Sequence, residues 1–234
     1  MENKNGQGIF YGVIGVATLV VAIIGATFAY FSASTSAGNG TIAGNTLDLQ
    51  GTALALAVTP VSLGSADNGP ALVPANIEVS TNGVQGALNA HCIDGKYTGC
   101  HVYQIKATAG TALTDAVLTL EMNTSATVKT DWAYIIYTDA NNTGTTASAL
   151  PSGLNGNFSA TNPTTVTILN GTTNASLAAG DTYWYLMIYL ADDTTNAQND
   201  PTDTANLATG TYDGSLTLSA GTGGKVSATF AAAA

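Results

Sequence analysis

The side chains best suited to metal or redox chemistry gather in one short segment of this chain. Its only two histidines and only two cysteines lie within residues 90–102, where His91-Cys92 and Cys100-His101 form two adjacent pairs. Two thiolates and two imidazoles are ligands that zinc accepts. Neighbouring residues of a strand point to opposite faces, so the histidine pair and the cysteine pair would not converge on one ion. The pattern therefore argues against a zinc site.

The two cysteines instead indicate a disulfide. Seven residues separate Cys92 from Cys100, and the turn signal Asp94-Gly95 lies between them. An even number of cysteines is typical of exported proteins, whose compartments favour disulfides. The sequence predicts a Cys92–Cys100 disulfide across a β-hairpin, and closing so short a loop should add about 2–3 kcal/mol of stability.

No set of residues predicts catalysis. The HExxH motif of zinc peptidases is absent, and a serine or cysteine nucleophile would have to use one of the two histidines just named. Neither histidine has a glutamate nearby in sequence that could act as a general base. We therefore expect no enzymatic activity and no cofactor.

An acidic loop over residues 191–206 offers the remaining candidate for a metal. Its carboxylate oxygens could hold calcium, and they belong to Asp192, Asp193, Asp200 and Asp203. The spacing matches neither an EF-hand nor a calcium-binding repeat. Acidic loops of this kind are usually solvated turns between strands. The favoured interpretation is a surface turn, with calcium binding as the alternative.

Composition and charge exclude two classes of partner. The chain has 234 residues, with five lysines and no arginine against 15 acidic residues, and a net charge of −10. Binding to nucleic acid requires a basic stripe, and adhesion to an anionic lipid surface requires positive charge. About 200 residues remain after the first thirty, enough to bury a core without metals or many disulfides. The sequence therefore predicts one folded domain that does not bind nucleic acid.

The longest feature is an uncharged apolar run over residues 9–31. A run of this length and hydrophobicity cannot lie on the surface of a soluble domain. It is a cleaved export signal, a retained membrane anchor or, after a prepilin-type cut behind Gly6 or Gly8, the helix of a filament core. The small residue at Ala29 favours cleavage between Ala29 and Tyr30. The prepilin alternative lacks the glutamate that bacterial type IV pilins carry near the start of this helix.

These boundaries divide the chain into three parts. Residues 1–29 are the signal peptide or membrane helix, residues 30–44 are a small and flexible arm, and residues 45–234 are one β-domain. Apolar residues of the domain alternate with Thr, Ser and Asn over short runs that Gly, Asn and Pro interrupt, as in half-buried strands. No helical period follows residue 30. The pattern predicts an all-β sandwich preceded by an N-terminal hydrophobic helix.

The strands of this sandwich can be placed from the alternation. They are expected at residues 45–50, 54–58, 101–108, 112–122, 132–138, 166–169, 182–190, 212–219 and 225–230. The segment 182–190 has apolar or aromatic side chains on both faces, with Tyr183, Tyr185 and Met187 on one of them. A strand of this kind is covered on both sides. It should therefore lie at the centre of a sheet.

Six N-x-S/T sequons also occur along the chain. They begin at Asn39, Asn123, Asn141, Asn157, Asn170 and Asn174. Such sequons matter only in a host that glycosylates its exported proteins.

Several motifs follow one another in a particular order. The apolar run ends in TFAYFSASTS, a Gly/Asn-rich stretch leads to NTLDLQ, and the C-terminal part carries YWYLMIYLADDTTNAQND, GTYDGSLTLSAG and KVSATF. Together with the cysteine segment CIDGKYTGCHVYQIKAT, this order resembles the TasA/camelysin family of exported biofilm-matrix proteins. The match to the family's GTLDL strand has Asn45 inserted between Gly44 and Thr46.

The resemblance implies a jelly-roll sandwich that polymerises by donor-strand complementation, in which the N-terminal segment of one subunit fills a groove in its neighbour. An arm with two aromatic residues and small neighbours suits this role, because it can add as a strand to an exposed sheet edge. The residues of this candidate arm are Tyr30, Phe31, Ser32, Ala33 and Ser34. The peptidase activity that the camelysin name implies is not carried over, because no zinc motif is recognisable.

The sequence therefore predicts a secreted structural subunit that forms extracellular fibres or biofilm matrix as a homopolymer. It would contact the membrane only through residues 9–29, before processing. The alternative is a membrane-anchored or pilin-like cell-surface protein that retains this helix.

Overall fold

The computed structural model describes most of the predicted β-domain. The described residues are 42–47, 53–61, 71–90, 92, 97–171, 176–192, 210–220 and 224–231, with the backbone alone for 42–47, 71 and 97. All of them belong to one compact unit of the chain, Ser36–Ala234. The predicted signal at residues 1–29, its cut before Tyr30 and the arm at residues 30–34 lie outside them. No helix in the described part is long and apolar enough to span a membrane.

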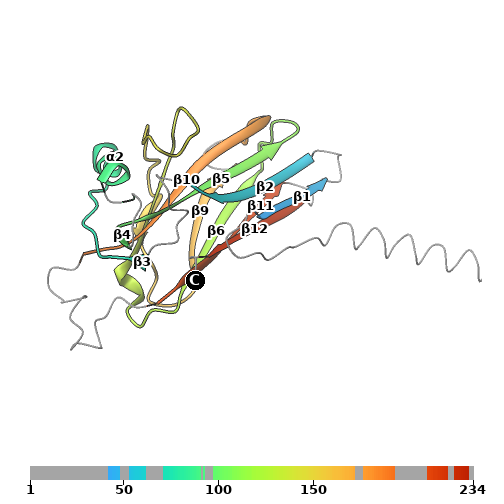
Figure 1. Ribbon diagram of the computed structural model, residues 1–234. Coiled ribbons are helices and arrows are strands. Elements are labelled where there is room, and N and C mark those ends of the chain that lie inside the picture. Colours follow the sequence, from blue (N-terminus) through green and yellow to red (C-terminus); the bar gives the residue numbers. More distant parts are fainter. Residues whose placement is uncertain are drawn as a thin grey trace, which may run out of the picture. The chain divides into compact units, whose positions relative to one another are not determined.

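In the described chain, two antiparallel sheets pack face to face as a β-sandwich (Figure 1). The six-stranded sheet has the order β1-β2-β5-β10-β7-β8, and the four-stranded sheet has the order β12-β11-β6-β9. The first sheet comprises β1 (Ile42–Leu47), β2 (Ala53–Pro60), β5 (His101–Ala109), β7 (Trp132–Tyr137), β8 (Asn155–Asn157) and β10 (Gly180–Leu190). The second comprises β6 (Val117–Thr124), β9 (Thr164–Asn170), β11 (Tyr212–Ala220) and β12 (Gly224–Ala231). The predicted all-β sandwich is thus confirmed.

The strand β10 is the central strand that its two apolar faces predicted. It pairs with β5 on one side and with β7 on the other. Its inward side chains are Trp184, Leu186, Ile188 and Leu190, which belong to the core between the sheets. Its outward side chains Tyr185, Met187 and Tyr189 belong to a second buried cluster. Burial on both faces explains why this strand shows no polar alternation.

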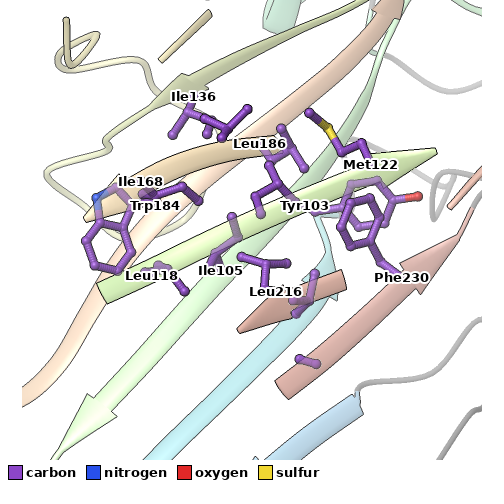
Figure 2. Packing of buried hydrophobic residues seen from close by; sticks show 14 of the residues in the cluster. Tyr103, Ile105, Leu118, Met122, Ile136, Ile168, Trp184, Leu186, Leu216 and Phe230 are labelled. Carbon is purple, nitrogen blue, oxygen red and sulfur yellow. The ribbon is translucent and has the colours of Figure 1, made fainter. Parts of the chain in front are cut away.

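The core between the sheets combines aliphatic and aromatic side chains from both layers (Figure 2). Ile105 and Leu186 come from the six-stranded sheet, and Leu216 comes from the four-stranded sheet. The rings of Tyr103 and Phe230 meet across the layers with their centroids 4.8 Å apart. The strand β12 alternates strictly between buried and exposed residues, so the period-2 pattern of its sequence directly reports its burial.

A helix covers part of the outer face of the six-stranded sheet, and the expectation of no helix after residue 30 is wrong. The helix α2 (Thr81–Ala90) buries Val84, Ala87 and Leu88, which lie on one helical face. They belong to the outer cluster, which also contains the outward side chains of β10. Two glycines and two asparagines give this segment poor helix propensity. Packing against the sheet, which no local pattern reports, stabilises it instead.

The start of this helix has a local cap that compensates for its weak sequence. The Ser80 hydroxyl accepts a hydrogen bond of 2.9 Å from the Gly83 backbone N–H, the usual N-cap arrangement. A Cβ at Gly83 would clash with the backbone carbonyl oxygen of Glu78. Glycine at position 83 therefore permits the close approach of the preceding chain.

Other boundaries also differ from the sequence prediction. The strand β1 begins at Ile42, so the last residues of the predicted 30–44 arm are already paired with β2. The strand expected at 112–122 begins only at Val117, because Leu113 forms an isolated bridge with Leu177 instead. Among the residues described around the cysteines, the expected β-hairpin is not formed. Cys92 follows α2, and β4 (Tyr97–Thr98) pairs in parallel with β3 (Ala71–Leu72).

Candidate assembly surface

The two lateral sides of the sandwich are built differently. On one side, the chain from β8 to β9 crosses from one sheet to the other and is tied down on the way. The Asn162 side chain accepts a 3.3 Å hydrogen bond from the Thr124 backbone N–H and donates one of 2.9 Å to the Thr124 carbonyl oxygen. The Ser159 N–H donates to the Thr164 hydroxyl at 2.7 Å. These bonds fasten the connection between the sheets, and β8 and β9 are the edge strands on this side.

The opposite side presents the other two strand edges, those of β12 and β1. There β12 lies beside β1 and β2 (Figure 1). Among the described residues, β12 forms strand pairs only with β11, and β1 only with β2. An edge strand with unpaired backbone groups is a template for an added strand. Only one charged side chain, Lys225, stands on β12 to discourage such pairing.

A buried chain of hydrogen bonds fixes the end of this edge. Tyr103 donates to the carbonyl oxygen of Ala231, the last residue of β12, at 3.0 Å. The Tyr103 and Tyr212 hydroxyls are 2.6 Å apart, and His101 Nδ1 lies 2.7 Å from the Tyr212 hydroxyl. Because Tyr103 has one proton and donates it to Ala231, Tyr212 must donate to Tyr103 and His101 Nδ1 must donate to Tyr212. All the donors thus point toward the end of β12.

Burial favours the neutral form of the two tyrosines in this hydrogen-bonded network, Tyr103 and Tyr212. Burial raises the pKa of Tyr103, an effect that the hydrogen bond from Tyr212 partly opposes. Burial also raises the pKa of Tyr212, and the electrostatic interaction and the hydrogen bond with Tyr103 raise it further. His101 is 3% exposed and lies inside the sandwich. One of the two histidines considered for metal binding therefore has a structural place beside the end of β12, while His91 lies outside the described residues.

The cysteine pair forms the predicted disulfide, but between different elements. Cys92 and Cys100 are bonded to each other, with their Cα atoms 4.7 Å apart. The Cys92 N–H donates to the Ala87 carbonyl oxygen at 2.9 Å, so Cys92 is held at the end of α2. The disulfide therefore anchors the end of this helix to the chain entering β5. Both sulfurs are buried in the outer cluster. Neither sulfur is therefore a free thiolate that could bind a metal.

The candidate calcium residues are only partly described. Asp192 is exposed, while Asp193, Asp200 and Asp203 lie outside the described residues. Over the portion of the chain that the structure describes, no three His, Cys, Asp or Glu side chains gather in a way that could hold a metal ion.

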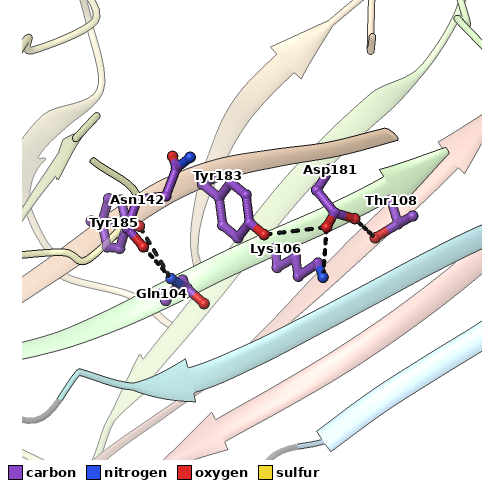
Figure 3. Close-up of polar contacts among 7 residues, drawn as sticks. All are labelled: Gln104, Lys106, Thr108, Asn142, Asp181, Tyr183 and Tyr185. Carbon is purple, nitrogen blue, oxygen red and sulfur yellow. Dashed lines mark hydrogen bonds and ion pairs between the residues drawn. The ribbon is translucent and has the colours of Figure 1, made fainter. Parts of the chain in front are cut away.

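A polar cluster that the sequence did not reveal lies on the outer face of β5 and β10 (Figure 3). Lys106 forms an ion pair with Asp181 at 2.8 Å, and the Thr108 hydroxyl donates to the same carboxylate at 2.6 Å. Tyr183 donates to Asp181 at 3.2 Å. The hydrogen bond from Lys106 and that from Thr108 lower the pKa of Asp181. Alternation places these residues on one face, but only the strand register brings them together.

The same face continues toward a loop after β7. The Gln104 amide donates to the Tyr185 hydroxyl at 3.1 Å and to the Asn142 carbonyl oxygen at 3.3 Å (Figure 3). Asp139 is 4% exposed and organises this loop by accepting bonds from the backbone N–H groups of Asn141 at 2.8 Å and of Gly144 at 2.8 Å. Burial opposes ionisation of Asp139, but these bonds and those from Thr143 outweigh it and lower its pKa.

Helix α2 and this loop support each other through one side chain. Gln85 accepts a bond of 2.9 Å from the Ala147 N–H, and its amide donates to the Thr145 carbonyl oxygen at 3.3 Å. The helix, the disulfide and the loop together form the cover over β10. None of these contacts involves the open edges at β1 and β12, so the cover and the edges are separate features of the domain.

No protein-family model matches this sequence, and a search of the curated proteins finds no significant match.

Proposed function

We propose that this protein is a secreted structural subunit that polymerises into extracellular fibres or biofilm matrix by donor-strand complementation. In this proposal the sandwich is of the jelly-roll type, and export removes residues 1–29. The N-terminal arm of one subunit, Tyr30–Phe31–Ser32–Ala33–Ser34, then pairs with an open edge of the next. The fibre is a homopolymer, and the domain has no enzymatic role.

The observation that carries the proposal is the open edge of β12 beside β1. Backbone groups on an unpaired edge gain hydrogen bonds from an added strand, and alternate side chains of that strand enter the core. Phe31 or Tyr30 would supply the apolar anchor. The pairing would also cover an edge that carries little protection against uncontrolled association.

In this mechanism the connection between the arm and β1 sets how far the arm can reach. Residues 35–41 separate the arm from Ile42, the first residue of β1. An extended chain covers about 3.3 Å per residue, so this linker spans roughly 23 Å. Since the edges of β1 and β12 lie on one side of the sandwich, an arm leaving β1 can extend from this side to a second copy.

Removal of the arm from the mature protein tests the proposal. A chain lacking residues 30–36 should remain a folded monomer, while the chain starting at Tyr30 forms fibres visible by electron microscopy. A synthetic peptide of residues 30–41 should bind the shortened domain, and a peptide with Tyr30→Ser and Phe31→Ser should not. Fibres formed by the shortened chain would rule out the donor-strand mechanism.

The length of the apolar run supports a second candidate, a cell-surface protein that retains its helix. Residues 9–31 carry no charged side chain and suffice to span a bilayer. The N-terminus of native protein distinguishes the candidates. A start at Tyr30 agrees with the fibre subunit, whereas a start at Met1 indicates an anchor and a start at Gln7 or Ile9 a pilin.

A further inference from the structure

The sequons of the described domain differ sharply in their structural settings. The acceptor asparagines of four of the six lie in the described chain, at Asn123, Asn141, Asn157 and Asn170, while Thr172 of the last sequon lies outside it. An N-linked glycan is bulky and hydrated, so its acceptor belongs in a surface loop. The transferase must also reach the Ser or Thr two residues later. A sequon whose three residues are all exposed satisfies both conditions.

The sequon at Asn123 is part of the sheet. Asn123 lies in β6 between β9 and β11, and its amide donates to the Asp213 carboxylate at 3.0 Å. The middle residue, Thr124, is 2% exposed, and its backbone N–H donates to the Asn162 side chain while its carbonyl oxygen accepts from it. Presenting this sequon to an enzyme would require β6 to leave the sandwich.

The sequon at Asn157 is held in a similar way. The Asn157 amide donates to the Thr130 carbonyl oxygen at 2.6 Å. Its middle residue Phe158 is 2% exposed, with its ring centroid 6.2 Å from that of Trp132. Asn170, the last residue of β9, is half-buried and engaged in an interaction of its own. The folded domain therefore does not present the Asn157 sequon.

The sequon at Asn141 has the opposite character. Asn141, Asn142 and Thr143 are all exposed, and they lie in the loop between β7 and β8. Within the described chain the Asn141 amide makes no hydrogen bond; only its backbone N–H is engaged, with Asp139 at 2.8 Å. Asn142 has a positive φ of 55°. The Asp139 carboxylate thus holds a bent loop while leaving the acceptor side chain accessible.

We propose that Asn141 is an N-glycosylation site, and the preferred one among the four sequons of the described domain. The substrate is an oligosaccharide carried on a lipid phosphate or pyrophosphate. A bond forms between Asn141 Nδ2 and the anomeric carbon of the sugar, and the bond from that carbon to the phosphate oxygen breaks. The lipid phosphate leaves with the bonding electrons, and the amide nitrogen loses one proton.

The loop that carries Asn141 is not part of the strand edges described above. It lies over the outer face of the six-stranded sheet, where the Asn142 carbonyl oxygen accepts a hydrogen bond from Gln104 of β5. The strand β12 lies beside β1 and β2. A glycan on Asn141 is therefore compatible with strand addition, and the proposal does not depend on the fibre function.

Peptide mass spectrometry of the full chain, exported by a host that N-glycosylates its secreted proteins, tests this site. The peptide containing Asn141 should carry a glycan in most molecules, with lower occupancy at Asn123, Asn157 and Asn170. Asn141→Gln should remove that glycan completely. Thr143→Ser should retain it, because the sequon and the hydroxyl that bonds to Asp139 at 2.8 Å both persist. A host glycoprotein from the same preparation serves as the control for active machinery.

Two results would overturn the proposal. One is an unmodified Asn141 peptide in a preparation whose control glycoprotein is glycosylated. The other is higher occupancy at Asn123 or Asn157 than at Asn141 in correctly folded, disulfide-bonded protein.

Discussion

The outer faces of the two sheets are covered in very different ways. The four-stranded sheet faces solvent with short polar side chains, such as Thr119, Ser227 and Thr229. The six-stranded sheet carries a second buried cluster beneath α2, in which Tyr185 and Met187 are 0% exposed. The bare face follows from simple alternation along each strand. The covered face requires a helix, a disulfide and a polar loop, none of which is a strand.

The domain therefore has two cores of different construction. The core between the sheets is held by regular strands on both sides. The outer cluster has a sheet on one side only, and its cover is fixed by particular bonds: the Cys92–Cys100 disulfide, the Ser80 cap, Gln85 and Asp139. We expect the second core to be more sensitive to loss of single polar or covalent contacts. The following variants test that expectation.

The largest effect is expected from truncation within the covered face. Met187→Ala should lower the free energy of unfolding by about 2–5 kcal/mol, because it leaves a cavity between β10 and its cover. Leu186→Ala, one residue away and facing the inner core, should cost a similar amount. Denaturant unfolding of the monomeric domain measures both.

The matched control for this pair lies on the bare face. Thr217→Ala on β11 should change stability by no more than about 0.5 kcal/mol, as surface substitutions usually do. A small effect of Met187→Ala beside a large effect of Leu186→Ala would show that the cover contributes little and that the domain has only one core.

Loss of the disulfide should have the next largest effect. The double variant Cys92→Ser with Cys100→Ser should lose about 2–3 kcal/mol, because the unfolded chain regains the freedom of the closed loop. Amide exchange should increase most in α2, whose end the bond anchors, and least in β11 and β12. An even increase over both sheets would contradict the view that the cover is a separate unit.

The smallest of the three effects, and a pH-dependent one, is expected at Asp139. Asp139→Asn should destabilise the domain by about 1–3 kcal/mol at neutral pH, since charge-assisted bonds to the loop N–H groups become neutral ones. The pKa of Asp139 is lowered in the folded state, so its contribution is present above the unfolded value of about 3.9. It is lost as the pH falls through the folded pKa.

Thermal unfolding as a function of pH measures this contribution. The stability difference between wild type and Asp139→Asn should shrink as the solution becomes acidic. Thr217→Ala, which changes no charge on the bare face, serves as the control, and its stability difference from wild type should not depend on pH. A gap that stays constant down to strongly acidic pH would mean that the Asp139 charge does not stabilise the loop.

Much of the fold could be predicted because strands report their own burial. The alternation in residues 225–230 and the two apolar faces of residues 182–190 led directly to β12 and β10. The helix α2 was missed for the opposite reason. Its Gly and Asn residues weaken the local signal, and the burial of Val84 and Leu88 depends on a sheet assembled from distant segments.

The candidate assembly surface likewise combines features that the sequence predicts with features that only the tertiary structure provides. The arm at residues 30–34 and its release by cleavage are predictions from the sequence alone. The edge of β12, which no further strand of the described chain pairs with, and its closeness to β1 depend on strand order, which follows from long-range pairing. The hydrogen bonds that lead from His101 through Tyr212 and Tyr103 to Ala231 join residues up to 128 positions apart, so no spacing rule could have found them.

The sequence by itself determined the β-rich class, the pairing of the cysteines and which strand would be central. The class follows from composition, the cysteine pairing from there being only two cysteines, and the central strand from apolar residues on both of its faces. All three can be read from the sequence without knowing which segments meet. The tertiary structure alone decided that the disulfide anchors a helix, that Asp181 meets Lys106, and that one sequon of the described four is fully exposed. Those outcomes depend on register and on packing between elements, where the free energy belongs to the contact and not to either segment.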